Sequence, residues 1–191
     1  IKDRIPVVIS SQEPEVLEVI EARAGERNTF VYLYGRDFSS VPKSEDLSGI
    51  YFDYHSYLHP RALHITPQKT SEKSQDFLGN TLDSRPPLAD TIHGCYLPLP
   101  GEHQMQNASV AIKTVELLSK KLTSNFIREG LKNVRWPGRL EIINDKPPIL
   151  IDGAHNPAAA VALSHALLKN FLWEYERIIL VLGIMDDKDI R

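Results

Sequence analysis

Residues 149–157 read Ile-Leu-Ile-Asp-Gly-Ala-His-Asn-Pro, and this stretch predicts a buried strand, a turn and the start of a helix. The strand is the apolar run at 149–151, while Asn156 and Pro157 are typical of a helix N-cap and a first helical residue. Asp152 is therefore expected at the carboxyl end of a strand, beside His155 and the unpaired N–H groups of a helix start. Open α/β sheets bind ligands at such an edge, and helix starts favour anions such as phosphate.

The segments around this stretch predict the beginning of an α/β domain. The expected order is strand, turn, strand, helix and strand, at residues 140–143, 144–146, 148–151, 157–171 and 177–182. Before them, the sequence Arg-Trp-Pro-Gly-Arg at 135–139 interrupts all periodicity and predicts a hinge or a domain boundary. We therefore expect one domain at residues 1–134 and a second at residues 135–191.

The first domain is also predicted to mix helices and strands. A strand, a helix and a second strand, at residues 5–9, 13–24 and 29–34, form a βαβ-like unit that feeds a parallel sheet, with Ser10 and Ser11 as candidate caps. Short β-prone stretches at 49–54, 62–66 and 95–99 alternate with polar, Pro-rich segments and predict hairpins or a meander. Residues 66–90 have no periodicity and are expected to form a loop.

Two helices are predicted at the end of this first domain. The longer helix covers residues 103–121, and the shorter one covers residues 123–132 with Thr123 or Ser124 as its cap. The expected apolar face of the longer helix consists of Ala108, Ala111, Ile112, Val115 and Leu118.

The bulk composition is that of an ordinary globular protein, with 191 residues, 42% hydrophobic and 25% charged. A net charge of −3, without a cluster of five Lys or Arg residues, gives no electrostatic support for nucleic-acid binding. The lone cysteine, Cys95, excludes an internal disulfide and indicates a reducing compartment. No apolar run approaches the ~18 residues of a membrane span, so a membrane partner is not expected.

The helix predicted at 103–121 begins with residues suited to nucleotide binding. His103, Gln104 and Asn107 can project from the same side of its first two turns. An Asn amide can pair with the edge of an adenine through one donor and one acceptor. Polar residues at this position also cap helix ends, and the spacing alone leaves both interpretations open.

Arg139 and Asp152 are candidates for binding the rest of a nucleotide. The planar guanidinium of an arginine can donate two parallel hydrogen bonds to a phosphate, although a surface arginine beside a packed tryptophan would have the same spacing. Asp152 can accept hydrogen bonds from ribose hydroxyls or from the backbone of its own turn. Residues 183–189 follow the last predicted strand and would lie at the same sheet edge, unless they form a solvated loop.

Several motifs are absent from the chain. It contains no G-x-x-x-x-G-K-[ST] loop, no G-x-S-x-G and no H-E-x-x-H. A nucleotide enzyme built from these residues alone would therefore lack its main phosphate-binding loop.

Four motifs, taken together and in order, resemble the folylpolyglutamate synthase/dihydrofolate synthase family of the Mur ligase superfamily. They are Gly-x-His-Gln-x-x-Asn-Ala at 101–108, Trp-Pro-Gly-Arg at 136–139, Ile-Asp-Gly-Ala-His-Asn-Pro at 151–157 and Gly-x-x-x-Asp-Lys-Asp at 183–189. The resemblance implies an α/β fold in two parts: the remainder of a P-loop-type central ATPase domain at 1–134, and the start of a Rossmann-like C-terminal ligase domain at 135–191.

The resemblance also implies a reaction and a set of site residues. In this family ATP, with Mg²⁺, phosphorylates a carboxylate of dihydropteroate or folate, and the amine of L-glutamate attacks the acyl phosphate to form an amide. By position, Asn107 resembles the adenine-binding amide, Arg139 the contact to the nucleotide phosphates, and Asp152 the nucleotide contact of the C-terminal domain. His155 is a further catalytic candidate, close enough to stabilise the phosphate or the acyl phosphate.

The resemblance places the P-loop and the magnesium ligands before Ile1, and the end of the glutamate-binding domain after Arg191. We therefore expect no metal ligand within these residues and no catalysis by the isolated chain, whereas the full-length protein is expected to be a cytoplasmic, monomeric ligase. Two alternatives stay open: another Mur-type amino-acid ligase, or a non-catalytic α/β nucleotide-binding module. The choice between dihydropteroate and folates is also open.

Overall fold

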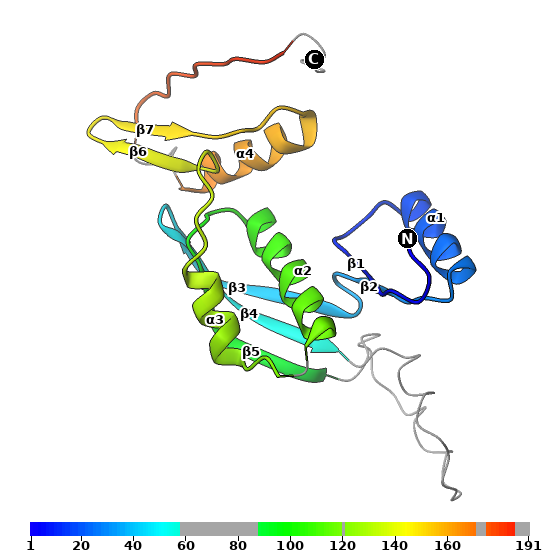
Figure 1. Cartoon of the computed structure of the whole chain (residues 1–191). Helices are drawn as coiled ribbons and strands as arrows, with labels where there is room; N and C mark the ends of the chain where they lie inside the picture. Colours follow the sequence, from blue (N-terminus) through cyan, green and yellow to red (C-terminus); the bar gives the residue numbers. More distant parts are fainter. Residues whose placement is uncertain (58–87, 120, 171–174, 186–191) are drawn as a thin grey trace, which may run out of the picture.

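The computed structural model describes residues 1–57, 88–119, 121–170 and 175–185. Within these residues the chain forms three parts that follow one another in sequence (Figure 1). The first is a βαβ unit, the second an antiparallel sheet covered by two helices, and the third a hairpin followed by a helix. This mixture of helices and strands confirms the predicted α/β class.

The N-terminal unit consists of β1 (Val7–Ile9), α1 (Pro14–Glu26) and β2 (Val31–Leu33). The two strands pair in parallel, as the βαβ prediction required. The predicted serine caps are wrong, because Glu13 holds the N-cap position without a side-chain hydrogen bond and Pro14 begins the helix. The fixed φ of proline suits a first helical turn, and its missing N–H removes one of the donors that a cap would otherwise satisfy.

The middle part is a three-stranded antiparallel sheet in the order β3-β4-β5. Its strands are β3 (Phe38–Asp46), β4 (Gly49–Tyr57) and β5 (Leu88–Leu97). The sheet confirms the predicted meander, while the stretch at 62–66 and most of the loop expected at 66–90 fall outside the described residues. The strand β3, which contains Pro42 and several polar residues, was not predicted from the sequence. Pro42 is tolerated because β3 is an edge strand with a register shift between Pro42 and Ser44.

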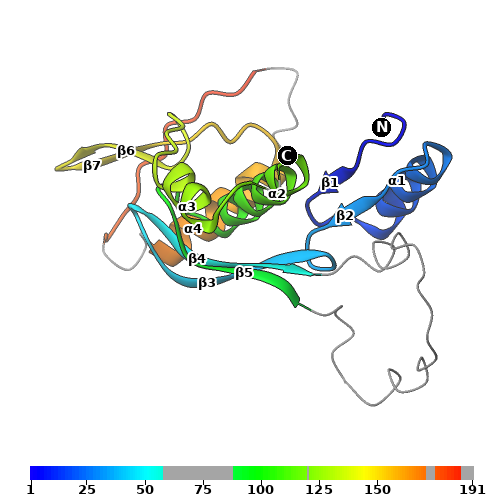
Figure 2. The same ribbon diagram turned by 60° about the horizontal axis from the view of Figure 1, so that its bottom comes forward.

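Helices α2 (Glu102–Leu118) and α3 (Ser124–Lys132) pack on one face of this sheet (Figure 2). The side chain of Thr123 accepts a hydrogen bond from the Phe126 N–H, which confirms the predicted cap of α3. The core between the sheet and the helices contains Phe38, Ile50, Phe52, Tyr54, Ile92, Cys95, Leu97, Leu99, Met105, Ala108, Ile112 and Leu131.

The predicted apolar face of α2 is partly wrong. Ala111, Val115 and Leu118 are exposed, whereas Ser109 and Lys113 are buried. Lys113 can be buried because its ammonium donates a hydrogen bond of 2.8 Å to the Ser56 hydroxyl and lies 5.1 Å from the centroid of the Tyr32 ring. These contacts come from other elements, so the helical period of the sequence could not reveal them.

The C-terminal part contains β6 (Glu141–Asp145), β7 (Pro148–Ile151) and α4 (Pro157–Asn170). The two strands form an antiparallel hairpin, and the Asn156 side chain accepts a hydrogen bond of 2.9 Å from the Ala159 N–H, so the predicted strands and cap are confirmed. The predicted burial of the strand is wrong, because Ile149 and Ile151 are exposed on this two-stranded hairpin. The strand predicted at 177–182 is wrong, because the described residues 175–185 pair with no other strand. A β-prone segment becomes a strand only where a neighbouring strand completes its backbone hydrogen bonds.

Candidate nucleotide site

A pocket of ≈ 360 Å³ lies between the first turns of α2, the segment at 136–140 and α4. It brings together three residues that the sequence singled out separately, Asn107, Arg139 and Asp152. The other lining residues are His103, Gln104, Trp136, Leu140, Ala159, Ala162 and Leu163. Motifs far apart in sequence therefore meet in one cavity, large enough for part of a small-molecule ligand.

The α2 side of the pocket is formed by His103, Gln104 and Asn107. The Asn107 Nδ2 donates a hydrogen bond of 3.4 Å to Gln104 Oε1, so the two amides are already oriented toward each other. Gly101 precedes them with φ +105°, and a Cβ atom there would lie 2.6 Å from Cε1 of the His103 ring. The glycine of this motif thus lets the imidazole fold back onto the helix start. Burial lowers the pKa of His103, which favours the neutral form of its ring.

Arg139 forms the cationic side of the pocket. Its guanidinium lies beside Gly153, where a Cβ atom would come within 3.7 Å of Nη1. Gly153 is tied to the same segment by a backbone hydrogen bond of 2.9 Å from its N–H to the Gly138 carbonyl. Within the part of the chain that the structure describes, the Arg139 side chain has no hydrogen bond or ion pair. Its donors are therefore available to an anionic ligand.

Asp152 links this segment to the loop before α4. One carboxylate oxygen accepts a hydrogen bond of 2.9 Å from the Leu140 N–H, and the other accepts one of 2.7 Å from the Ala154 N–H. Leu140 is buried and has φ +46°, a left-handed conformation that is unusual for leucine. The turn interpretation of Asp152 is therefore observed, and each carboxylate oxygen still has a second lone pair for a ligand.

His155 lies outside the residues that line this pocket. Its side chain is exposed, and Nδ1 donates a hydrogen bond of 2.9 Å to the Gly153 carbonyl. This bond leaves Nε2 of the neutral ring as the acceptor. Among the residues at 183–189, only 183–185 are described, and none of them lines the pocket.

Sequence reasoning did not assign Trp136, Ala159, Ala162 or Leu163 to this site. The last three share one side of α4 at helical spacing, and an apolar helical period normally indicates core packing. Their place in the pocket follows from the packing of α4 against α2. No local signal in the sequence could have shown that packing.

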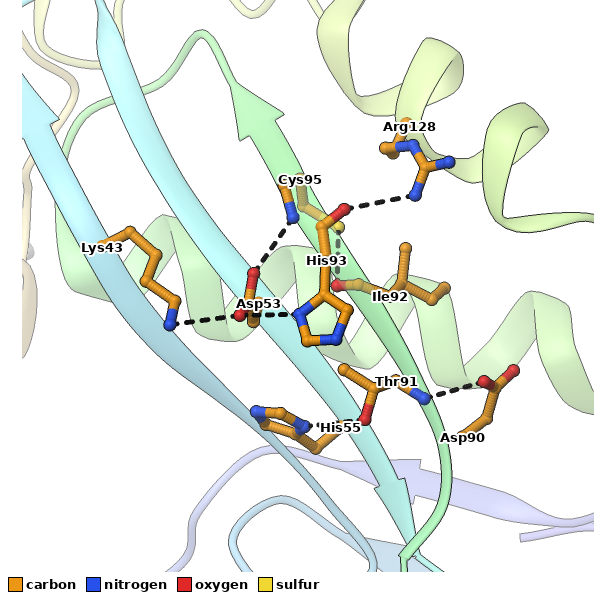
Figure 3. A network of polar contacts seen from close by, with 10 residues as sticks. Lys43, Asp53, His55, Asp90, Thr91, Ile92, His93, Cys95 and Arg128 are labelled. Carbon is orange, nitrogen blue, oxygen red and sulfur yellow. Dashed lines mark hydrogen bonds and ion pairs between the residues drawn. The ribbon is translucent and has the colours of Figure 1, made fainter.

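A second polar cluster lies on the sheet face opposite α2 (Figure 3). The Asp53 carboxylate accepts hydrogen bonds from the Gly94 N–H at 3.0 Å and from His93 Nδ1 at 2.9 Å, and it forms an ion pair with Lys43 at 3.1 Å. Burial alone would raise the pKa of Asp53, but these three partners outweigh it and hold the pKa at about 2. The cluster stabilises an irregular part of the β4–β5 ladder, where the register shifts and Gly94 has φ +66°.

Groups of three or more His, Cys, Asp or Glu side chains placed to hold a metal are absent from the described ranges. Over those same residues, no helix has the length and apolar character needed to cross a bilayer.

Comparisons with known proteins identify one matching domain and several similar proteins. Residues 138–191 match the family model of the Mur ligase, glutamate ligase domain. The chain is 33% identical to folylpolyglutamate synthase of Lacticaseibacillus casei over 99% of its own length and 37% of that protein. It therefore spans about a third of the length of such relatives.

Solved structures show the same likeness. A folylpolyglutamate synthase complex with AMPPCP and folate superposes with a TM-score of 0.69 at 31% identity, covering 88% of this chain and 35% of the other. Folylpolyglutamate synthase of Mycobacterium tuberculosis, complexed with ADP, superposes with a TM-score of 0.68 at 27% identity, covering 88% of this chain and 32% of that one.

The matching domain and the shared fold define the class of protein that this chain resembles: residues 138–191 match the glutamate ligase domain of Mur ligases, and the solved structures with the same fold are folylpolyglutamate synthases. Over nearly its whole length the chain is homologous to folylpolyglutamate and dihydrofolate synthases. The resemblance read from the four motifs is thereby confirmed.

Proposed function

We propose that the protein carrying this chain is an ATP-dependent ligase that adds L-glutamate to dihydropteroate, to folates or to both. The convergence of Asn107, Arg139 and Asp152 on one pocket supports this proposal most strongly. An amide, a free guanidinium and a carboxylate are the groups that an adenine, a phosphate chain and a ribose would each require.

The reaction proposed is acyl transfer through a phosphorylated intermediate. A substrate carboxylate oxygen attacks the γ-phosphorus of ATP, and ADP leaves. The amine of glutamate then attacks the acyl carbon, inorganic phosphate leaves, and an amide remains. Mg²⁺ would neutralise charge on the ATP phosphates, and its ligands are not expected among the described residues.

Each site residue has a proposed role in this reaction. Asn107 would hold the adenine, Arg139 the nucleotide phosphates and Asp152 the ribose, while His155 would act near the acyl phosphate from the loop before α4. We also propose the domain boundary at 134/135. Asn107 then belongs to one domain and the other three residues to the next, so the nucleotide is held where the two domains meet. Closing the two domains on each other would exclude water from the hydrolysable intermediate.

Nucleotide binding by the full-length protein that carries this chain tests these roles directly. We expect Arg139→Gln and Asn107→Ala each to weaken AMPPCP binding, measured by titration calorimetry, by about tenfold or more, which corresponds to about 1.4 kcal/mol. Arg135→Gln is the matched control, because Arg135 is exposed at the same segment and donates hydrogen bonds to the carbonyls of Lys132 and Val134. Equal affinities in Arg139→Gln and Arg135→Gln would exclude the proposed phosphate contact.

The two alternatives are separated by substrate. The full-length protein can be screened with dihydropteroate, tetrahydrofolate and UDP-muramoyl compounds, each with ATP and glutamate. We expect ADP release with dihydropteroate, with tetrahydrofolate or with both. ADP release with the muramoyl compounds alone would identify another Mur-type ligase. Nucleotide binding without turnover of any substrate would favour a non-catalytic module.

A further inference from the structure

An ion-pair cluster joins the far end of α4 to the start of α2. The Lys169 ammonium donates to Glu45 Oε2 at 2.7 Å and to Glu102 Oε1 at 3.0 Å. The side chain of Glu45 is only 4% exposed, and its other oxygen accepts a hydrogen bond of 2.8 Å from the Gly101 N–H. One lysine of α4 therefore contacts both the end of β3 and the first residue of the helix that holds Asn107.

The cluster borders a second pocket of ≈ 300 Å³ that adjoins the candidate nucleotide site. The two pockets share His103 and Ala162 in their linings, so they are neighbours in the cleft between α2 and α4. Along this cleft α4 presents Ala159, Ala162, Ala166 and Lys169, which recur at helical spacing on one side. The row consists of small side chains and ends with the charged contacts of the lysine.

We propose that Lys169, Glu45 and Glu102 form a clamp that positions α4 against α2 and so sets the width of the nucleotide pocket. None of the three residues lines the pocket with Asn107, Arg139 and Asp152, so they act through the placement of the two helices. Lys169 is thus a positioning residue, and this inference rests on the proposed function of the site.

Charge and burial explain why the clamp would hold. Removing water from the Glu45 carboxylate is costly unless a cation and hydrogen-bond donors replace it, and Lys169 and the Gly101 N–H supply these. Without the lysine, the buried Glu45 carboxylate would lose the ammonium that lies 2.7 Å from its Oε2 atom. The helix would then separate from the cleft, because hydrating the carboxylate requires opening it.

The test replaces the cation and then restores it elsewhere, in the full-length protein that carries this chain. We expect Lys169→Glu to raise the Kd for AMPPCP about tenfold, which corresponds to a binding-competent population of about one tenth. Adding Glu102→Lys returns one cation between two carboxylates and should recover most of the affinity. Glu102 suits the swap because its side chain is 59% exposed, whereas Glu45 also holds the Gly101 N–H. Lys132→Glu is the control, since Lys132 lies in the last turn of α3 as Lys169 lies in the last turn of α4.

A second measurement separates the clamp from the proposed function. Spin labels at the exposed positions Val161→Cys on α4 and Phe126→Cys on α3 report the distance from α4 to α3, the neighbour of α2 on the sheet. This measurement needs no nucleotide. We expect a narrow distribution in the parent, a broad one in Lys169→Glu and a narrow one again in the swap. Unchanged distances and affinity in Lys169→Glu, or a swap that restores neither, would overturn the clamp. Absence of AMPPCP binding by the parent would instead overturn the proposed function while the distances still test the clamp.

Discussion

The replacement Asp152→Asn tests how the candidate site is held together. In the structure each carboxylate oxygen of Asp152 accepts one backbone N–H, from Leu140 on one side and from Ala154 on the other. An asparagine of the same shape has one oxygen and one NH₂ group. One of the two backbone donors would therefore face another donor instead of an acceptor.

The magnitude follows from the charge and burial of these groups. A hydrogen bond to a charged group contributes about 1.5–3 kcal/mol, and leaving a buried N–H without an acceptor costs about 1–3 kcal/mol. Leu140 is 3% exposed, so water cannot easily replace the lost acceptor. We expect the free energy of local opening at this segment to fall by roughly 2 kcal/mol, which corresponds to about 30-fold faster amide exchange.

Native-state hydrogen exchange measured by NMR gives the opening free energy at single amides. Faster exchange is expected at whichever of the Leu140 and Ala154 amides loses its acceptor, together with weaker AMPPCP binding, because Arg139 precedes Leu140. Asp46→Asn is the control: a single oxygen of Asp46 accepts from both the N–H and the hydroxyl of Ser48, so an asparagine oxygen can keep both bonds. If both amides exchanged in Asp152→Asn as slowly as in the parent, the proposed link between the two segments would be refuted.

Three further predictions concern stability, each measured by urea unfolding. Because the pKa of Asp53 is lowered to about 2, the ionised carboxylate stabilises the fold fully above its ordinary pKa of 3.8, and this stabilisation is lost as pH falls through about 2. The difference in unfolding free energy between the parent and Asp53→Asn should therefore shrink by roughly 2 kcal/mol between pH 6 and pH 2. A difference that stays constant over this range would contradict the prediction. Gly49→Ala should disrupt the β3–β4 turn, because Gly49 has φ +150° and a Cβ atom there would lie 2.2 Å from the Leu97 carbonyl oxygen. Gly130→Ala in α3 is the control: a Cβ atom there would have no other atom within 4 Å, so this variant should be neutral or stabilise the fold by up to ~1 kcal/mol. Ile112→Ala should cost about 2–5 kcal/mol because Ile112 is 2% exposed in the core, while Ile112→Val should cost about 1 kcal/mol; similar losses in both would mean that the site collapses around the cavity.

Several elements were predictable from the sequence because their signals are local. Pro157 and the Asn156 cap define the start of α4, Thr123 defines the start of α3, and the βαβ pattern of the first residues gives the parallel pair β1–β2. A cap, a proline or a helical period depends on residues within one or two turns, so one sequence is enough to read it. The motifs that indicated the family are local in the same sense.

Other features depended on contacts between distant residues. The edge strand β3 exists despite Pro42 because β4 provides its hydrogen bonds. The segment at 177–182 is not a strand, because no strand among the described residues pairs with it. Lys113 is buried because groups on β2 and β4 solvate its ammonium. Pairing and solvation of this kind are set by the whole fold, which a sequence period does not report.

The sequence by itself provided three candidate side chains for a nucleotide: the Asn107 amide, the Arg139 guanidinium and the Asp152 carboxylate. Only the tertiary structure placed them around one pocket, gave both carboxylate oxygens a backbone partner and put His155 outside the lining. It also left the guanidinium without a hydrogen bond to any residue that the structure describes. The chemical type of a side chain belongs to the residue. Its distance, burial and partners depend on how α2, the segment at 136–140 and α4 pack, and that packing is decided by long-range contacts.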